Sequence, residues 1–361
     1  MYQTSVILTD QVIVDAFAYR SELYCWTLNN ELEIFSIAAV IEALNKQYGD
    51  IGGAAAYSLF CSRGIGASKR MVRAFREAPS ISGPLELSIK PDFKLRVIRD
   101  FSFCLDLRLY YDRLYLATDK GAFVTPAHKG FFADKKRLIP DVLNEYYAVA
   151  LSTGLRAVAT SLGKLGLSIV LNEPNQDMGP KKIINLAGPS IRSSISASRI
   201  ANFPSNDQCR LYKTRLGRGV RREDIGIADV DAYGEDVSGL SNSAPAEGYS
   251  YWDGRHKRLV SVSATRISAF MPATGNTSLT LASDHQLSSE PLSVEMTGNH
   301  YMAIESADSI TLARSGSAVR FETGACTSLR TYRSSFRFRR LATCTTKAGL
   351  WLIAAYEGQE W

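Results

Sequence analysis

Residues 340–353 read RLATCTTKAGLWLI. This stretch contains an apolar segment, Arg340–Cys344, a polar turn at Lys347–Gly349 and a second apolar segment, Leu350–Ile353. Two short apolar segments joined by a turn of this composition predict a β-hairpin. The hairpin ends near Tyr356 and only Glu357–Trp361 follow it, so an outer strand that completes its sheet has to come from elsewhere.

The same unit occurs repeatedly along the chain, which is typical of a repeat architecture. Seven copies in 361 residues average 361/7, or about 52 residues each, which is more than the ~40–45 of a compact propeller blade and indicates insertions. The other six predicted hairpins cover residues 23–35, 113–124, 155–171, 200–212, 258–270 and 301–312, of which 200–212 has the weakest pattern.

Further strands flank these hairpins, so that each copy predicts a four-stranded blade with strands a to d. We expect inner strands (a) at 12–17, 97–103 and 291–294, and outer strands (d) at 85–89, 183–186, 278–281 and 318–321. Ser5–Leu8 precede the first inner strand and can complete the last blade, which would pair both ends of the chain and protect the sheet edges. The sequence therefore predicts an all-β, seven-bladed β-propeller, a single domain over 1–361 closed by the N-terminal strand.

This pattern resembles a divergent WD40 propeller over nearly the whole chain. No blade ends in Trp-Asp and none opens with Gly-His, so the resemblance lies in the repeat and not in the motifs. Asp284-His285 precedes the sixth copy and Asp308 lies in its b–c turn. In WD40 proteins a histidine and an aspartate at these places join a structural hydrogen-bond network, and the resemblance implies that role for His285 and Asp308.

Two stretches depart from the strand pattern. Residues 36–84 form a predicted helical insertion in blade 1, with helical spacing at 37–44 and 67–76 and a turn at Gly49, Gly52 and Gly53. Residues 214–246, after blade 4, are rich in Gly, Asp and Ser and predict a loop insertion. Both begin after a c strand, as does the c–d connection of blade 2 at 126–140. Topology therefore places all three on the face of the a–b loops.

Basic residues concentrate in these three connections and around the a–b loop of the last blade. We expect a partner to bind this face electrostatically, either an acidic protein surface or a nucleic acid, whose phosphates favour clustered Lys and Arg. Aromatic residues are interleaved with the last cluster, but the alternation of Phe336–Arg339 favours a half-buried strand over base stacking. The predicted binding residues are Arg63, Lys69, Arg70, Arg73, Arg76, Lys129, Lys135, Lys136, Arg137, Arg215, Arg218, Arg221, Arg222, Arg333 and Arg337.

The composition is that of an ordinary globular protein and excludes a disordered chain. Hydrophobic residues make up 45% and charged residues 22%, and 42 Lys+Arg against 36 Asp+Glu give a net charge of +6. The six cysteines form no CxxC pair, so we expect buried free thiols in a reducing compartment. The sequence shows no secretory signal and no apolar run of ~18 residues, which predicts a cytoplasmic protein.

Signatures of catalysis are weak. The four histidines, His128, His256, His285 and His300, have no carboxylate at ligand spacing, and Gly64–Lys69 lacks the spacing of a phosphate loop. No nucleophile motif is present, and the sequence predicts no cofactor and no metal.

The leading functional hypothesis is a non-catalytic scaffold subunit of a larger complex, which binds a partner through the loops of one basic face. A first alternative is a nucleic-acid-binding propeller in a ribonucleoprotein or DNA-processing complex, whose affinity would fall steeply with salt. A second is a propeller enzyme with a central-pore site built from inner-strand residues such as Asp15, Asp100 and Glu295.

Overall fold

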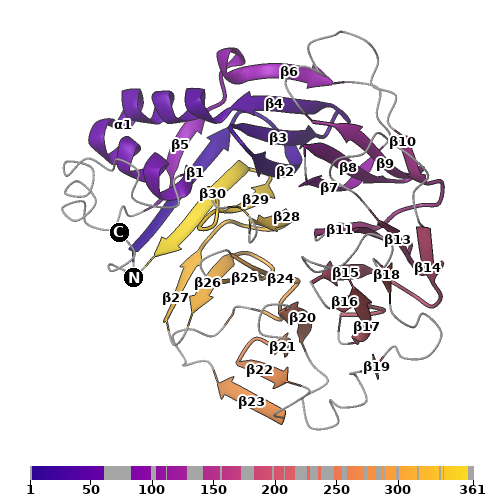
Figure 1. Ribbon diagram of the computed structural model, residues 1–361. Coiled ribbons are helices and arrows are strands. Elements are labelled where there is room, and N and C mark those ends of the chain that lie inside the picture. Colours follow the sequence, from indigo (N-terminus) through magenta and orange to yellow (C-terminus); the bar gives the residue numbers. More distant parts are fainter. Residues whose placement is uncertain are drawn as a thin grey trace. The chain divides into compact units, whose positions relative to one another are not determined.

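The chain is described by a computed structural model (Figure 1). It describes residues 2–60, 83–98, 103–110, 112–127, 141–154, 157–171, 183–196, 199–206, 208–215, 226–227, 235–236, 248–253, 258–271, 275–280, 287, 289–297, 301–314, 317–332, 335 and 337–356. The chain forms two compact units, residues 1–100, 263–266 and 280–361 on one hand, and residues 101–262 and 267–279 on the other. The prediction that residues 1–361 form a single domain stays a prediction.

Three blades lie in the first unit. Blade 1 consists of β2 (Ile13–Tyr19), β3 (Glu22–Thr27), β4 (Leu32–Ser36) and β6 (Lys94–Ile98). Blade 6 consists of β24 (Ser293–Met296), β25 (Met302–Glu305), β26 (Ile310–Arg314) and β27 (Ser317–Phe321). Blade 7 consists of β28 (Cys326–Thr331), β29 (Ala342–Thr346), β30 (Gly349–Tyr356) and β1 (Tyr2–Thr9).

The other four blades lie in the second unit. In blade 5, residues 263–266 and residue 280 belong to the first unit. Blade 2 consists of β7 (Cys104–Tyr110), β8 (Arg113–Thr118), β9 (Gly121–Pro126) and β10 (Asp141–Asn144); blade 3 of β11 (Ala150–Gly154), β12 (Ala157–Ser161), β13 (Leu167–Leu171) and β14 (Ile183–Leu186). Blade 4 consists of β15 (Arg192–Ile195), β16 (Arg199–Phe203), β17 (Arg210–Arg215), β18 (Gly226–Ile227) and β19 (Glu235–Asp236); blade 5 of β20 (Tyr249–Asp253), β21 (Arg258–Val262), β22 (Arg266–Met271) and β23 (Gly275–Thr280).

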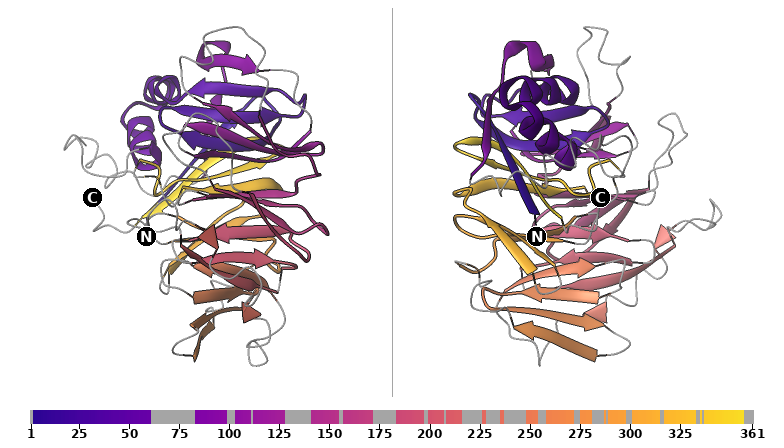
Figure 2. Two further views of the ribbon diagram at one scale, coloured as in Figure 1. Left: turned by 45° about the vertical axis from the view of Figure 1, so that its right-hand side comes forward. Right: turned by 90° about the vertical axis from the view of Figure 1, so that its left-hand side faces the viewer.

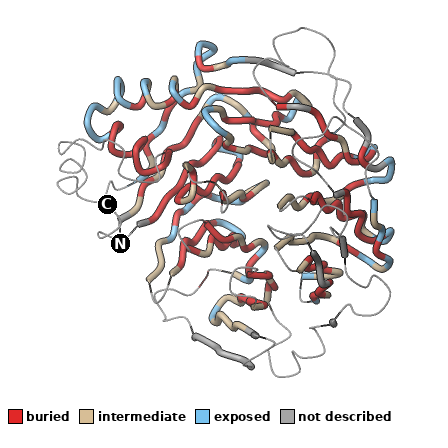
Figure 3. The backbone as a smooth tube through the Cα atoms, in the orientation of Figure 1, coloured by how far each residue is buried: buried red, intermediate tan, exposed pale blue. Residues whose placement is uncertain are grey.

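Seven sheets of this kind confirm the predicted seven-bladed β-propeller fold in the described part of the chain. The N-terminal strand completes blade 7 as expected: β1 pairs antiparallel with β30, with Val6 opposite Leu352 and Leu8 opposite Leu350. The pairing of β1 with β30 is favourable because it covers a buried part of the blade: β29 and most of β30 are buried along their length (Figure 3). Val6 and Leu8 pack into the same hydrophobic cluster as Leu350 and Leu352.

Two strand predictions around blade 1 are wrong. Leu85–Ser88 (β5) is not the outer strand of blade 1 but pairs parallel with β1, at the edge of blade 7. The outer strand is β6, paired with β4, and the inner strand of blade 2 is consequently β7 and not residues 97–103. Both stretches have strand-like apolar patterns, and only the pairing distinguishes them. Helix α1 (Ile37–Phe60) follows β4 directly and packs against both β1 and β5.

The helical insertion begins as predicted and continues further. Ser36 caps α1 by accepting a hydrogen bond from the Ala39 amide at 3.3 Å. The kink falls at Gly49, whose φ of 58° interrupts the helix. Gly52, predicted to lie in a turn, is helical, and a Cβ there would overlap the carbonyl oxygen of Leu44. The predicted helix at 67–76 lies outside the described residues.

Helix α1 packs against the edge of blade 7 (Figure 2). The hydroxyl of Tyr48 donates to the carbonyl oxygen of Glu86 in β5 at 2.6 Å, which ties the helix to the parallel strand. Apolar residues of α1, Val40 and Leu44 among them, are buried in one cluster with Val6 of β1 and Leu352 of β30. Among the described helices, none is both long enough and apolar enough to span a membrane.

Of the described cysteines, Cys25, Cys104, Cys209 and Cys344 are buried free thiols as predicted, whereas Cys326 is a half-buried free thiol. Asp308 accepts from Ser309 Oγ at 3.1 Å and pairs with Arg320 at 3.3 Å. His285, its expected partner in the WD40-like network, lies outside the described residues.

Candidate partner-binding surface

The inner strands of blades 1 and 2 place an aspartate at the same position. Asp15 in β2 and Asp106 in β7 both follow a bulge in the pairing with the b strand, and both strands show the same alternation of buried and half-buried residues. Both aspartates are buried. A buried carboxylate is costly unless it is paired or hydrogen-bonded, so the contacts of these two residues indicate what they do.

Asp15 joins blade 1 to blade 7. Arg330 of β28 donates from Nε to Asp15 Oδ1 at 3.1 Å and from Nη2 to Oδ2 at 2.6 Å, a two-point contact that suits guanidinium and carboxylate. Next to it, the Tyr332 hydroxyl accepts from the Ala18 amide at 2.9 Å, and its ring meets Phe17 edge-on at 5.1 Å. Burial raises the pKa of Tyr332 far above its usual value, so the hydroxyl stays protonated.

Asp106 and Glu295 join their own blades to the next ones. Asp106 Oδ2 accepts from the Leu151 amide of β11 at 2.7 Å, and Asp106 Oδ1 lies 3.4 Å from Nε of Arg108 in its own strand. Glu295 of β24 accepts from the Thr331 amide at 2.7 Å and from the Thr331 hydroxyl at 3.0 Å. Burial raises the pKa of nearby Glu305 to about 7, and the charge of Glu295 adds to this while Arg330 opposes it.

These contacts bear on the hypothesis of a central-pore site. Asp15 and Glu295, two of its three proposed residues, connect inner strands of neighbouring blades, and Asp100 lies outside the described residues. Among the described residues no group of three His, Cys, Asp or Glu is arranged to hold a metal ion. All four histidines lie outside the described part of the chain.

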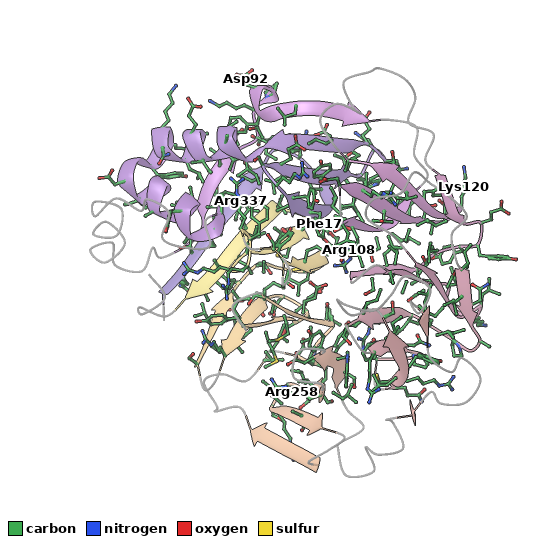
Figure 4. The ribbon with its side chains drawn as sticks, viewed as in Figure 1. Phe17, Asp92, Arg108, Lys120, Arg258 and Arg337 are labelled. Atoms are coloured by element: carbon green, nitrogen blue, oxygen red, sulfur yellow. The ribbon has the colours of Figure 1, made fainter. Side chains whose placement is uncertain are left out.

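Most of the predicted basic binding residues also lie outside the described part of the chain. The structure describes Arg337 and the backbone of Arg215. Arg337 donates from Nη1 to the carbonyl oxygen of Arg20 at 2.8 Å and to Ser21 Oγ at 3.1 Å (Figure 4). Its Nε reaches the carbonyl oxygen of Phe60, the last residue of α1, at 3.4 Å. Arg337 therefore connects the a–b turn of blade 1 with the end of the helix. Residues outside the description are Arg63, Lys69, Arg70, Arg73, Arg76, Lys129, Lys135, Lys136, Arg137, Arg218, Arg221, Arg222 and Arg333.

The segment around Arg337 differs from its prediction in one respect. Residues 337–340 form a bend and a turn, not a strand, although Phe338 is buried as a strand residue would be. Phe338 lies edge-on to Phe60 at 6.4 Å and to Tyr332 at 5.8 Å. The aromatic residue alternates with arginines because it anchors a loop into the core.

The strand ends that lead into the three long connections are described. β4 ends at Ser36 opposite Glu22, and β9 ends at Pro126 opposite Arg113. In blade 4, Lys213 of β17 lies opposite Arg199. Each c strand thus ends beside the a–b turn of its own blade, as the topological argument requires within each blade.

The opposite end of the blades exposes large apolar side chains, which the sequence reasoning missed. In the second unit, Phe103, Tyr146, Tyr147 and Leu165 are 46, 61, 52 and 62% exposed. Phe103 precedes β7, the two tyrosines connect β10 to β11, and Leu165 lies in the b–c turn of blade 3. We call these four residues the blade 2–3 apolar patch.

Hydrogen bonds place the members of this patch around two neighbouring turns. The Asp119 amide donates to the Phe103 carbonyl at 3.3 Å, and the Ala148 amide, next to Tyr147, donates to the Thr118 carbonyl at 3.1 Å. The Val149 amide donates to the Ser161 carbonyl at 2.8 Å, beside the turn that carries Leu165. Charged residues surround the patch: Asp119, Lys120, Glu145 and Lys164 are all exposed (Lys120 is labelled in Figure 4).

The first unit shows the same tendency at the equivalent end of its blades. Val12 and Leu28 are 52 and 64% exposed, and the Leu28 amide donates to the Val12 carbonyl at 3.2 Å. Leu292, which precedes β24, is 58% exposed. A usable signal was present in the sequence, because a large apolar residue at the very end of a predicted strand, such as Leu28 directly before the turn Asn29-Asn30, lies at the rim of a blade and outside its core.

Arg192 is a half-buried cation at the start of blade 4. Its guanidinium stacks between the rings of Phe203 and Tyr249, 3.9 and 4.0 Å from their centroids, and donates to the Asn206 carbonyl at 3.2 Å. Desolvation lowers its pKa. The aromatic faces compensate for the missing hydration, so this arginine joins β15 and β16 to β20 of blade 5.

No protein-family model matches the sequence, and no curated protein matches it. Solved structures do match. The WD40 β-propeller domain of Doa1 has a TM-score of 0.55 at 10% identity, over 99% of this chain and 97% of that one. The β-propeller domain of Cps50 (Swd1) from Myceliophteria thermophila has 0.52 at 9% identity, over 97 and 98%. The computationally designed protein Ika8 has 0.51 at 11% identity, over 98 and 100%. At such identities the likeness shows the fold alone, that of a divergent WD40-like seven-bladed propeller.

Proposed function

We propose that this protein is an interaction scaffold that binds a partner protein through the blade 2–3 apolar patch. The observation that carries the proposal is the exposure of four large apolar side chains around two adjacent turns. Scattered exposed apolar residues are normal, but a group of them surrounded by charged residues is typical of a protein-binding surface. Tyrosines are also enriched among the residues that dominate binding energy.

The blades that carry the patch are held together by internal polar contacts. Asp106 links blade 2 to blade 3 through the Leu151 amide, and Ser190 Oγ donates to Ser161 Oγ at 2.9 Å next to the patch turn of blade 3. A rigid frame lowers the entropic cost of presenting loop residues to a partner. We further propose that the protein acts in the cytoplasm as a subunit of a larger assembly.

Paired substitutions test this function. Phe103→Ser with Tyr147→Ser should reduce partner capture from nuclease-treated native lysate at least tenfold, measured by quantitative mass spectrometry. Leu95→Ser with Ile183→Ser is the matched control, because these residues are 47 and 50% exposed but lie on outer strands of blades 1 and 3. Equal capture by wild type and the Phe103/Tyr147 variant, with an unchanged melting temperature, would refute binding through the patch.

The basic connections support a second candidate, the binding of nucleic acid or an acidic protein. Its specific support is that the c strands of blades 1, 2 and 4 end beside the a–b turns of their blades. Changing Arg218, Arg221 and Arg222 to Glu should abolish capture of nucleic acid and flatten its salt dependence if this candidate holds. Nucleic acid that is retained by this variant, or absent from the wild-type capture, would remove the candidate.

A further inference from the structure

Blade 7 places two cysteines on neighbouring strands. Cys326 begins β28, and Cys344 lies in the middle of β29. The strands pair antiparallel with Cys326 opposite Thr346 and Leu329 opposite Cys344, so the two cysteines are diagonal neighbours on the same face of the sheet. Both pack into one hydrophobic cluster with Leu329 and Trp351.

A bulge interrupts the strand pairing between the two cysteines. Diagonal neighbours in a regular ladder lie ~7–8 Å apart, at the upper limit of what a disulfide spans. Here the register shifts at Thr327, whose hydroxyl lies 2.6 Å from that of Thr345 and 3.0 Å from the Val14 carbonyl oxygen of blade 1. The extra residue therefore points away from the cysteines, which stay on one face of the sheet and pack in one hydrophobic cluster.

The two thiols differ in accessibility and acidity. Cys326 is half-buried, while Cys344 is buried. The hydrogen bond from Cys344 lowers the pKa of Cys326, and the same bond raises the pKa of Cys344 well above its usual value. The hydroxyl of Thr323, 3.5 Å from Cys326 Sγ, also lowers the pKa of Cys326. An accessible thiol of lowered pKa beside a second thiol is the arrangement found in redox-sensitive cysteine pairs.

We propose that Cys326 is a site of oxidation by peroxide and that Cys344 resolves it into a disulfide. The Cys326 thiolate attacks one oxygen of hydrogen peroxide, so that an S–O bond forms, the O–O bond breaks and hydroxide leaves. Sulfur loses two electrons and peroxide gains them. The Cys344 sulfur then attacks Cys326, an S–S bond forms, the S–O bond breaks, and the departing hydroxide takes the Cys344 proton as water. A dithiol reverses the bond by exchange.

The disulfide would enclose residues 327–343, which contain the a–b connection of blade 7. This connection carries Arg333 and Arg337, two of the residues predicted to bind a partner. Arg337 also holds the blade 1 turn at Arg20 and Ser21. Oxidation therefore acts on a segment that links blade 7 to blade 1, and the inference does not depend on the function proposed above.

Peptide mapping of the full chain tests the proposal. Trypsin places Cys326 in peptide 321–330 and Cys344 in peptide 341–347. After treatment with hydrogen peroxide, alkylation and digestion without reductant, we expect these two peptides to appear linked, two hydrogens lighter than their sum. The linked species should disappear after dithiothreitol. The peptide of buried Cys25 is the internal control and should remain alkylatable only after unfolding.

Two variants separate the roles of the cysteines. Cys344→Ser should leave a sulfenic acid at Cys326 that a dimedone probe traps at least tenfold more than in the wild type, because the resolving thiol is missing. Cys326→Ser should abolish both linkage and trapping. Oxidation of Cys326 in the wild type without any linkage would overturn the disulfide, and oxidation of Cys326 no faster than that of Cys25 would overturn the site.

Discussion

Blades 1 and 2 begin with the same inner strand and connect to their neighbours differently. β2 and β7 share a bulge, an aspartate after it and a tyrosine at the end, and their b strands continue with the same burial pattern. Both carboxylates pair with an arginine, but Asp15 reaches Arg330 in the neighbouring blade 7, whereas Asp106 lies 3.4 Å from Arg108 of its own strand and meets the neighbouring blade 3 through the Leu151 amide. The comparison shows that the repeat determines where a buried carboxylate lies, and the neighbouring blade determines whether a charged side chain or a peptide group makes the contact between blades.

The largest effect is expected from removing the charge partner of Asp15. Arg330→Ala leaves that carboxylate buried without its cation and should lower the free energy of unfolding by about 3–5 kcal/mol in urea titrations. Arg320→Ala is the matched control: its partners Asp308 and Glu322 have side chains 57 and 70% exposed. We expect about 0–1 kcal/mol there. Similar losses in both variants would show that the buried pair contributes no more than a surface pair.

A smaller effect concerns the pH dependence of the same region. Burial raises the pKa of Glu305 from its usual 4.5 to about 7, so between these pH values the folded chain retains a proton that the unfolded chain has lost. Stability should therefore fall as pH rises from about 4.5 to about 7, by at most about 3–4 kcal/mol. Glu305→Gln should remove this component in urea titrations across that range, and an unchanged slope would contradict the assignment.

The smallest of the three effects on stability concerns Asp106, the second aspartate of the comparison. Asp106→Ala removes the acceptor of the Leu151 amide and should cost about 1–3 kcal/mol, because a buried amide loses its partner. Asp106→Asn retains a side-chain oxygen for the Leu151 amide and should recover more of the loss than Asp15→Asn, since Arg330 contacts Asp15 at two points, at 3.1 and 2.6 Å, whereas Arg108 lies 3.4 Å from Asp106. Equal recovery at both positions in urea titrations would mean that the two aspartates act alike.

Much of the fold follows from local patterns along the chain. The b–c hairpins of all seven blades lie where alternating apolar residues and polar turns predicted them, and β1 completes the last blade as expected. The errors lie where two apolar segments compete for one role. Residues 85–89 and 94–98 both qualify as strands, and their pairing depends on the path of α1, which the pattern of the strands does not contain.

The candidate surface was less accessible to sequence reasoning. Clustered arginines were visible at once, but Arg337 turned out to hold a turn and a helix end through backbone carbonyl groups. The exposed side chains of Phe103, Tyr146 and Tyr147 were hidden among many apolar residues, because hydrophobicity alone does not show whether a residue is buried.

The sequence by itself determined the number of blades, the hairpins and the closure of the last blade by the first strand, since these depend on period-2 patterns and turn residues that act over short distances. Only the tertiary structure decided which carboxylates meet a cation, which thiols meet each other and which apolar residues remain exposed. Those outcomes depend on contacts between residues such as Asp15 and Arg330, which are 315 positions apart. Local periodicity carries no information over such a separation, and the packing of one blade on the next supplies it.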